Sequence, residues 1–93
     1  MPRASADPPP ARVLVVDDEP VVGDVLRTLL TSEGHHVEVA PDAATGRSLL
    51  EGGGPWDALL LDVMLPDADG LDVLWWVREQ APDVAVVMIT AFG

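Results

Sequence analysis

Short apolar runs alternate along the chain with segments in which apolar residues recur at helical spacing. The apolar runs are residues 13–16, 37–40, 57–61 and 84–89. The segments with helical spacing are about residues 20–33, 43–51 and 70–81. Unbroken apolar runs are typical of strands buried on both faces, as in parallel sheets covered by helices. The alternation therefore predicts an α/β fold with a parallel sheet and right-handed crossovers.

Local features refine this series. Residues 37–40 alternate with polar neighbours, which predicts a less buried strand near an edge of the sheet. Asp42 is a suitable N-cap for the second helix, and Gly34 a suitable stop for the first. Trp56 is expected to pack at the start of the third strand.

The third helical segment contains adjacent tryptophans, Trp75 and Trp76, which cannot both face the sheet. We expect Leu71, Leu74 and Val77 to face the sheet, together with Trp75. Trp76 is then expected to be exposed, either as an incidental surface residue or as a contact with a partner.

Composition narrows the possible functions. The 93 residues suffice for one domain, and the formal charge of −11 argues against direct binding of nucleic acid or of an anionic membrane. The absence of cysteine excludes disulfides, thiolate metal sites and thiol catalysis, and is compatible with the cytoplasmic location that we expect. Residues 1–11 are rich in Pro and Ala, lack a signal-peptide core and predict a disordered tail, which leaves residues 12–93 for the domain.

Acidic and hydroxyl residues follow the predicted strands. Asp17 and Asp18 follow the first strand, Asp62 follows the third and Thr90 follows the fourth. The carboxyl ends of parallel strands form one rim, where ligands gather in open α/β sheets. Carboxylates brought together there repel one another unless a cation joins them, and Mg²⁺ prefers such oxygen ligands. A carboxylate in such a site is also a candidate nucleophile towards phosphorus.

Three motifs carry a family resemblance. Asp17-Asp18, then L-L-L-D-V-M-L-P-D-A-D-G, then V-V-M-I-T-A-F-G resemble, in order and spacing, the receiver domain of two-component response regulators. That family accepts a phosphoryl group from a histidine kinase. The resemblance implies a flavodoxin-like, three-layer α/β/α fold, with strand order 2-1-3-4 for the strands present here.

The resemblance also implies a role for each site residue. Asp62 would be the phosphoacceptor, and Thr90 would hydrogen-bond the phosphoryl group and move as part of the switch. Asp18 would ligate Mg²⁺ directly, Asp17 partly through water, and Met64 through its backbone carbonyl. The implied partners are a histidine kinase or phosphotransfer protein and an output domain in a longer parent chain, and the segment itself is not expected to be an enzyme.

The family pattern extends beyond these residues. A fourth helix, a fifth strand with its lysine, and a fifth helix have no counterpart in the sequence, so we expect an incomplete receiver domain that exposes the edge of its fourth strand and part of a sheet face. Two alternatives remain open: an interaction module or inactive fragment that is not phosphorylated, and an aspartate-nucleophile phosphohydrolase. The phosphohydrolase would need a second aspartate two residues after the nucleophile, where Met64 stands.

Other candidate residues have simpler interpretations. His35 and His36 fall in the turn after the first helix, away from the predicted rim, so we expect surface histidines. Asp67, Asp69 and Asp72 are interpreted as solvated loop residues and as charges that suit a helix N-terminus.

Overall fold

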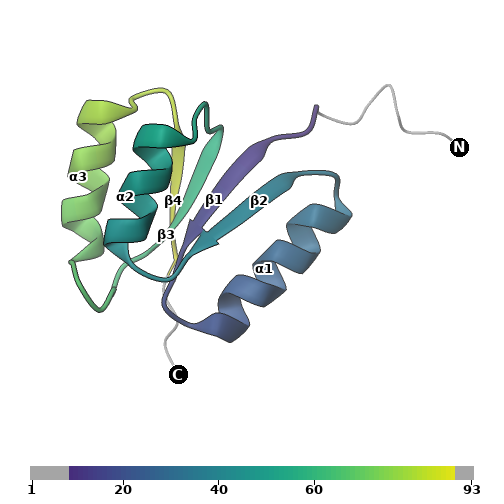
Figure 1. The fold of residues 1–93 in the computed structure, drawn as a ribbon, viewed down its shortest axis with the longest axis horizontal. Coiled ribbons are helices and arrows are strands. Elements are labelled where there is room, and N and C mark those ends of the chain that lie inside the picture. The colour runs from purple at the N-terminus through teal and green to yellow at the C-terminus, as the bar shows by residue number, and fades with distance from the viewer. Residues whose placement is uncertain (1–8, 90–93) are drawn as a thin grey trace, which may run out of the picture.

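The computed structural model describes residues 9–89, which form four strands and three helices (Figure 1). In chain order the elements are β1 (Arg12–Val16), α1 (Pro20–Ser32), β2 (His36–Ala40), α2 (Ala43–Gly52), β3 (Ala58–Asp62), α3 (Gly70–Gln80) and β4 (Ala85–Ile89). All strand pairs are parallel, and the strand order is β2-β1-β3-β4. The predicted series of elements and the predicted strand order are both confirmed.

The sheet is covered on both faces, by α1 on one side and by α2 and α3 on the other (Figure 1). Two glycines allow the helices to approach closely. A Cβ added to Gly23 of α1 would lie 2.9 Å from Val39, and one added to Gly46 of α2 would lie 2.8 Å from Val16. Val39 pairs with Val15. Because side chains alternate along a strand, Val15 and Val16 point to opposite faces, as the two helices require.

The main hydrophobic core lies between the sheet and the α2–α3 layer. Its buried members are Leu14, Val16, Ala40, Ala43, Trp56, Leu59, Leu61, Val73 and Val77. Trp56 precedes β3, is only 7% exposed and donates its Nε1–H to the carbonyl of Leu49 at 2.9 Å. The predicted packing of Trp56 is therefore confirmed, as is the position of β2 at an edge of the sheet.

The predicted orientation of α3 is confirmed for Val77, which is buried, and for Leu74, which packs against the core, but it is wrong for Leu71 and for both tryptophans. Val73 and Val77 are buried, whereas Leu71 is 52% exposed and Trp75 is 69% exposed. Trp76 is partly buried and packs against the core. Residues 70, 73 and 77 share one helical face, and Gly70 fixes that face towards the sheet because its backbone lies against β3. The guanidinium of Arg47, which belongs to α2, lies 5.5 Å from the centre of the Trp76 ring.

On the α1 side of the sheet, β4 is incompletely covered. Val86 and Met88 pack against the core on the α3 side, so Val87 between them faces the α1 side, where it is 51% exposed. On α1, Val25 is 50% and Leu29 57% exposed. The exposed strand edge and sheet face expected from the sequence are thus present in the part of the chain described.

The two histidines lie far from the carboxyl end of the sheet. His36 opens β2, and His35 accepts the backbone N–H of Ala11 through Nδ1 at 3.0 Å. Both positions agree with the prediction that these residues lie away from the acidic rim. None of the helices within residues 9–89 is long and apolar enough to cross a bilayer. The predicted tail lies mostly outside the described residues.

Candidate functional site

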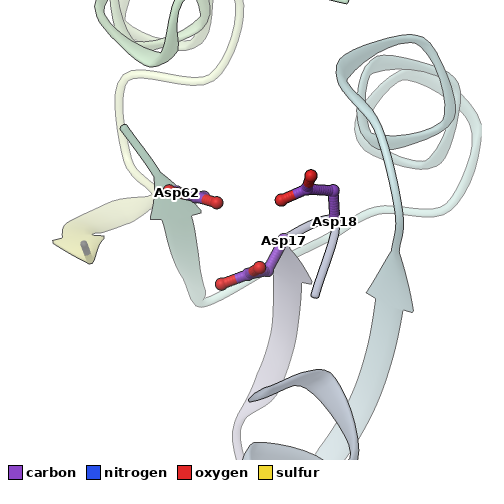
Figure 2. Close-up of side chains that lie close together, drawn as sticks. All are labelled: Asp17, Asp18 and Asp62. Carbon is purple, nitrogen blue, oxygen red and sulfur yellow. The ribbon is translucent and has the colours of Figure 1, made fainter. Parts of the chain in front are cut away.

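Three carboxylates meet at the carboxyl end of the sheet. Asp17 and Asp18 follow β1, and Asp62 is the last residue of β3 (Figure 2). These two strands are neighbours, with Val16 paired to Leu61, so the residues that follow emerge side by side. One carboxylate oxygen from each aspartate lies within 4.8 Å of the others. The strand topology therefore gathers the three acids that the sequence places at strand ends.

Two of these carboxylates are removed from solvent. Asp17 is 3% exposed and Asp62 is 6% exposed, whereas Asp18 is exposed. Asp17 accepts the backbone N–H of Glu19 at 2.8 Å, and Asp62 accepts that of Met64 at 3.0 Å, each through Oδ1. Within residues 9–89, the backbone N–H groups of Glu19 and Met64 are the hydrogen-bond donors to these two carboxylates. No cationic side chain in that range donates to either carboxylate.

Burial and like charge act together on Asp17. Burial raises the pKa of Asp17, the charges of Asp62 and Asp18 raise it further, and the hydrogen bond from Glu19 only partly opposes them. Two unit charges about 4 Å apart repel by about 4 kcal/mol at an effective dielectric constant of about 20. A hydrogen bond to a charged group contributes about 1.5–3 kcal/mol. Burial has the largest effect on the pKa of Asp17 and the like charges act in the same direction, so a cation bound beside the carboxylates would stabilise their ionised forms.

The donor set suits a hard divalent cation. Every side-chain ligand atom in the cluster is a carboxylate oxygen. Two of the acids are buried and the third, Asp18, is open to solvent, so a bound cation would keep several of its waters. Mg²⁺ is commonly held by one or two carboxylates with waters completing its coordination, whereas Ca²⁺ takes more protein ligands. The residues present fit Mg²⁺.

Gly70 lets α3 begin directly beside Asp62. A Cβ at this position would clash with the carbonyl oxygen of Asp62 and would lie 2.7 Å from the Cα of Val63. Its backbone N–H donates to the carbonyl of Val63 at 2.8 Å. The glycine after the acidic motif is therefore required by the close approach of two backbone segments.

Asp67 has a role that the sequence interpretation missed. Its carboxylate accepts the backbone N–H groups of Ala43 at 2.9 Å and of Ala44 at 3.0 Å, at the N-terminus of α2. These bonds, together with the charge of Arg47, lower the pKa of Asp67. Asp67 is exposed, as a solvated loop residue would be, but its hydrogen bonds to α2 were not predicted, and no local signal could reveal them because its partners lie 23 and 24 residues away.

The other acids of this loop behave as expected. Asp69 caps α3 by accepting the N–H of Leu71 at 2.8 Å, and Asp72 lies in the first turn of that helix. Both suit the positive end of the helix dipole. They do not belong to the cluster of three carboxylates.

The remaining predicted site residues are Met64 and Thr90. The side chain of Met64 is 72% exposed, and its backbone N–H is the donor to Asp62. Thr90 lies outside the described residues. The preceding residue, Ile89, pairs with Asp62 and accepts the N–H of Val63 at 3.0 Å, so the last described residue of β4 lies beside the acidic site.

Comparisons with known proteins agree with this geometry. The family model described as the response regulator receiver domain matches residues 13–93. The chain is 44% identical over 86 residues to the transcriptional regulatory protein TrcR of Mycobacterium tuberculosis, covering 92% of this chain and 33% of that protein. It is 42% identical to the probable transcriptional regulatory protein TcrX of the same organism, covering 92% of this chain and 36% of that protein.

Solved structures give the same result. A CheY-like response regulator receiver domain protein from Methanospirillum hungatei has a TM-score of 0.85 and 30% identity, covering 90% of this chain and 66% of that one. The response regulator TrrA from Thermotoga maritima, in complex with Mg²⁺-BeF, has a TM-score of 0.80 and 30% identity, covering 89% of this chain and 71% of that one. The chain belongs to the family of response regulator receiver domains. It spans about a third of the length of the curated relatives.

Proposed function

We propose that this chain is a phosphoacceptor domain of a two-component phosphorelay, in which Asp62 receives a phosphoryl group in the presence of Mg²⁺. The observation that carries the proposal is the buried Asp62 carboxylate beside Asp17 and Asp18 in a member of the receiver family. The donor would be a histidine kinase or a phosphotransfer protein. The Mg²⁺-BeF complex of TrrA supports this assignment by similarity.

The reaction requires one free oxygen on Asp62. Oδ1 is held by the N–H of Met64, so Oδ2 is the oxygen that attacks phosphorus. A P–O bond forms to the carboxylate, the bond from phosphorus to the donor's imidazole nitrogen breaks, and its electron pair stays on that nitrogen. The product is an acyl phosphate. When bound, Mg²⁺ supplies positive charge that offsets the repulsion between carboxylate and phosphoryl oxygens.

The surrounding residues then take complementary roles. Asp18, the exposed member of the cluster, would ligate Mg²⁺ directly, and Asp17 partly through water. The backbone carbonyl of Met64 would be a further ligand, and the Thr90 hydroxyl would hydrogen-bond the phosphoryl group. The domain acts as a switch rather than as an enzyme with turnover, and works in the cytoplasm. The relatives named as transcriptional regulators support a link to an output domain in a longer parent chain.

Phosphoryl acceptance can be tested directly. The 93-residue protein is incubated with Mg²⁺ and phosphoramidate, and its intact mass is measured alongside Asp62→Asn. We expect the wild-type protein to gain one phosphoryl group and Asp62→Asn to gain none. Asp83→Asn, which removes one charge outside the acidic cluster, is the matched control and is expected to react like wild type.

Two results would contradict the proposal. Equal labelling of wild type and Asp62→Asn would place the phosphoryl group elsewhere. A folded wild-type protein that binds Mg²⁺ but gains no mass would favour an interaction module that is not phosphorylated.

A further inference from the structure

The loop from Val63 to Asp69 carries the backbone next to the acidic site. At its start, the N–H of Met64 is bound by Asp62, and the carbonyl of Val63 accepts the N–H of Gly70. Met64 also forms an antiparallel bridge with Asp69. Both ends of the loop are therefore held close to β3 and α3.

The middle of the loop is held by a different element. Asp67 places its two carboxylate oxygens on the N–H groups of Ala43 and Ala44 at the start of α2. Asp42 accepts the N–H of Thr45 at 2.7 Å in the same helical turn. Two carboxylates thus satisfy three N–H groups that a helix N-terminus leaves without intrahelical partners.

This contact is particular to Asp67. Within residues 9–89, the hydrogen bonds of Asp67 are the only side-chain hydrogen bonds that join loop residues 63–69 to α2. The N–H of Met64 donates to Asp62 in β3, and Asp69 accepts the N–H of Leu71 in α3. Leu65 and Ala68 add apolar contact with the core, which is less directional than a carboxylate bridging two adjacent amides.

We propose that Asp67 is a positioning residue for the acceptor site. By fixing the middle of the loop to α2, it holds the backbone of Met64 in the conformation that Mg²⁺ and the phosphoryl group require. Without this contact the loop samples other conformations. The apparent affinity for Mg²⁺ then falls in proportion to the fraction of molecules whose loop is in the binding conformation. The inference rests on the proposed function of the same site.

The test compares Asp67→Ala, Asp67→Asn and Asp72→Ala with wild type. Asp72→Ala is the matched control because it removes one carboxylate from the first turn of α3, near the same loop. The Mg²⁺ dissociation constant is measured by calorimetry, and amide hydrogen exchange is followed by NMR in the metal-free protein.

We expect Asp67→Ala to weaken Mg²⁺ binding by about tenfold, the lower end of the range for residues that support metal ligands. The amides of Ala43, Ala44 and Met64 should exchange faster. Asp67→Asn keeps one side-chain carbonyl oxygen and should recover part of both effects. Asp72→Ala should leave the exchange of these amides unchanged and alter the dissociation constant by less than about twofold, because an exposed charge is screened.

The inference is overturned if Asp67→Ala binds Mg²⁺ as wild type does, or if Asp72→Ala weakens binding equally, since charge alone would then explain the change. Faster exchange at Ala43 and Ala44 with unchanged exchange at Met64 would also overturn it, because Asp67 would then only cap α2. A wild-type protein that binds Mg²⁺ without accepting a phosphoryl group would overturn the proposed function, while the effect of Asp67 on Mg²⁺ binding would still be measured.

Discussion

The polar groups at the amino end of the sheet and those at its carboxyl end differ in the contacts that they make. At the amino end, the guanidinium of Arg12 lies 4.4 Å from the centre of the Trp56 ring, and Nη1 of Arg12 donates to the carbonyl of Pro55 at 3.3 Å. Asp57 accepts the backbone N–H of Arg12 at 2.8 Å. At the carboxyl end, by contrast, Asp17 and Asp62 are buried within reach of each other's charge.

This difference links the amino end of the sheet to stability and the carboxyl end to function. The polar groups at the amino end are hydrogen-bonded or stacked on Trp56, so that end contributes to the free energy of folding. The carboxylates at the other end repel one another, which opposes folding, and binding of the proposed cation would relieve that repulsion. Buried carboxylates to which no cationic side chain donates are an unfavourable arrangement, and such arrangements are expected at functional sites.

The largest expected effect is at the amino end. Trp56→Ala should lower the free energy of unfolding by about 3–5 kcal/mol, because it removes a buried aromatic side chain and leaves a cavity. Trp56→Phe keeps most of the packing but loses the bond to Leu49, and should cost about 1–2 kcal/mol. Both are measured by urea unfolding in the presence of EDTA. Asp62→Asn, measured in the same way, should not destabilise the protein, and equal losses at both ends would contradict the comparison.

Asp17→Asn should have a smaller effect of opposite sign. Without metal it should raise the free energy of unfolding by roughly 1–3 kcal/mol, because repulsion is removed while an oxygen remains to accept the N–H of Glu19. The same substitution should weaken the Mg²⁺-dependent rise in melting temperature. Asp83→Asn is the control for a charge change elsewhere. A destabilised Asp17→Asn would show that its hydrogen bond outweighs the repulsion.

The raised pKa of Asp17 gives this effect a pH dependence. The folded protein holds the Asp17 proton more tightly than the unfolded chain does. The contribution of Asp17 to stability is therefore fully present below the unfolded pKa and is lost as the pH rises through the folded pKa. In EDTA, the stability difference between Asp17→Asn and wild type should grow by up to roughly 1–3 kcal/mol with rising pH, as repulsion develops. Saturating Mg²⁺ should reduce or reverse that trend, and a difference independent of pH would contradict it.

Most of the architecture could be predicted because the signals are local. Apolar runs that end at Asp, Pro or Thr define the strands, and the carboxyl ends of parallel strands must share a rim, which brings Asp17, Asp18 and Asp62 together. The orientation of α3 could not be predicted from periodicity, since residue 71 and residues 73–77 are all apolar and mark every side of the helix. Its orientation follows instead from the contact of Gly70 with β3, which is tertiary information.

The role of Asp67 was hidden for the same reason. An aspartate in a loop between Pro and Gly is compatible with simple solvation, and its partners belong to a helix that starts 24 residues earlier. Only the folded arrangement, which brings the loop after β3 to the N-terminus of α2, reveals the contact. A sequence pattern therefore located the charges of the site but not the side chain that supports its loop.

The smallest expected effect tests whether the two ends are independent. Arg12→Met keeps the apolar stem but loses the charge over Trp56, and should lower the free energy of unfolding by about 0.5–1 kcal/mol. Arg12→Lys keeps the charge without the planar group and should fall between wild type and Arg12→Met. Because the two ends share no residue, both variants should bind Mg²⁺ as wild type does by calorimetry. A weakened Mg²⁺ site in Arg12→Met would show that the stability of the amino end is transmitted along β1 to the carboxylates.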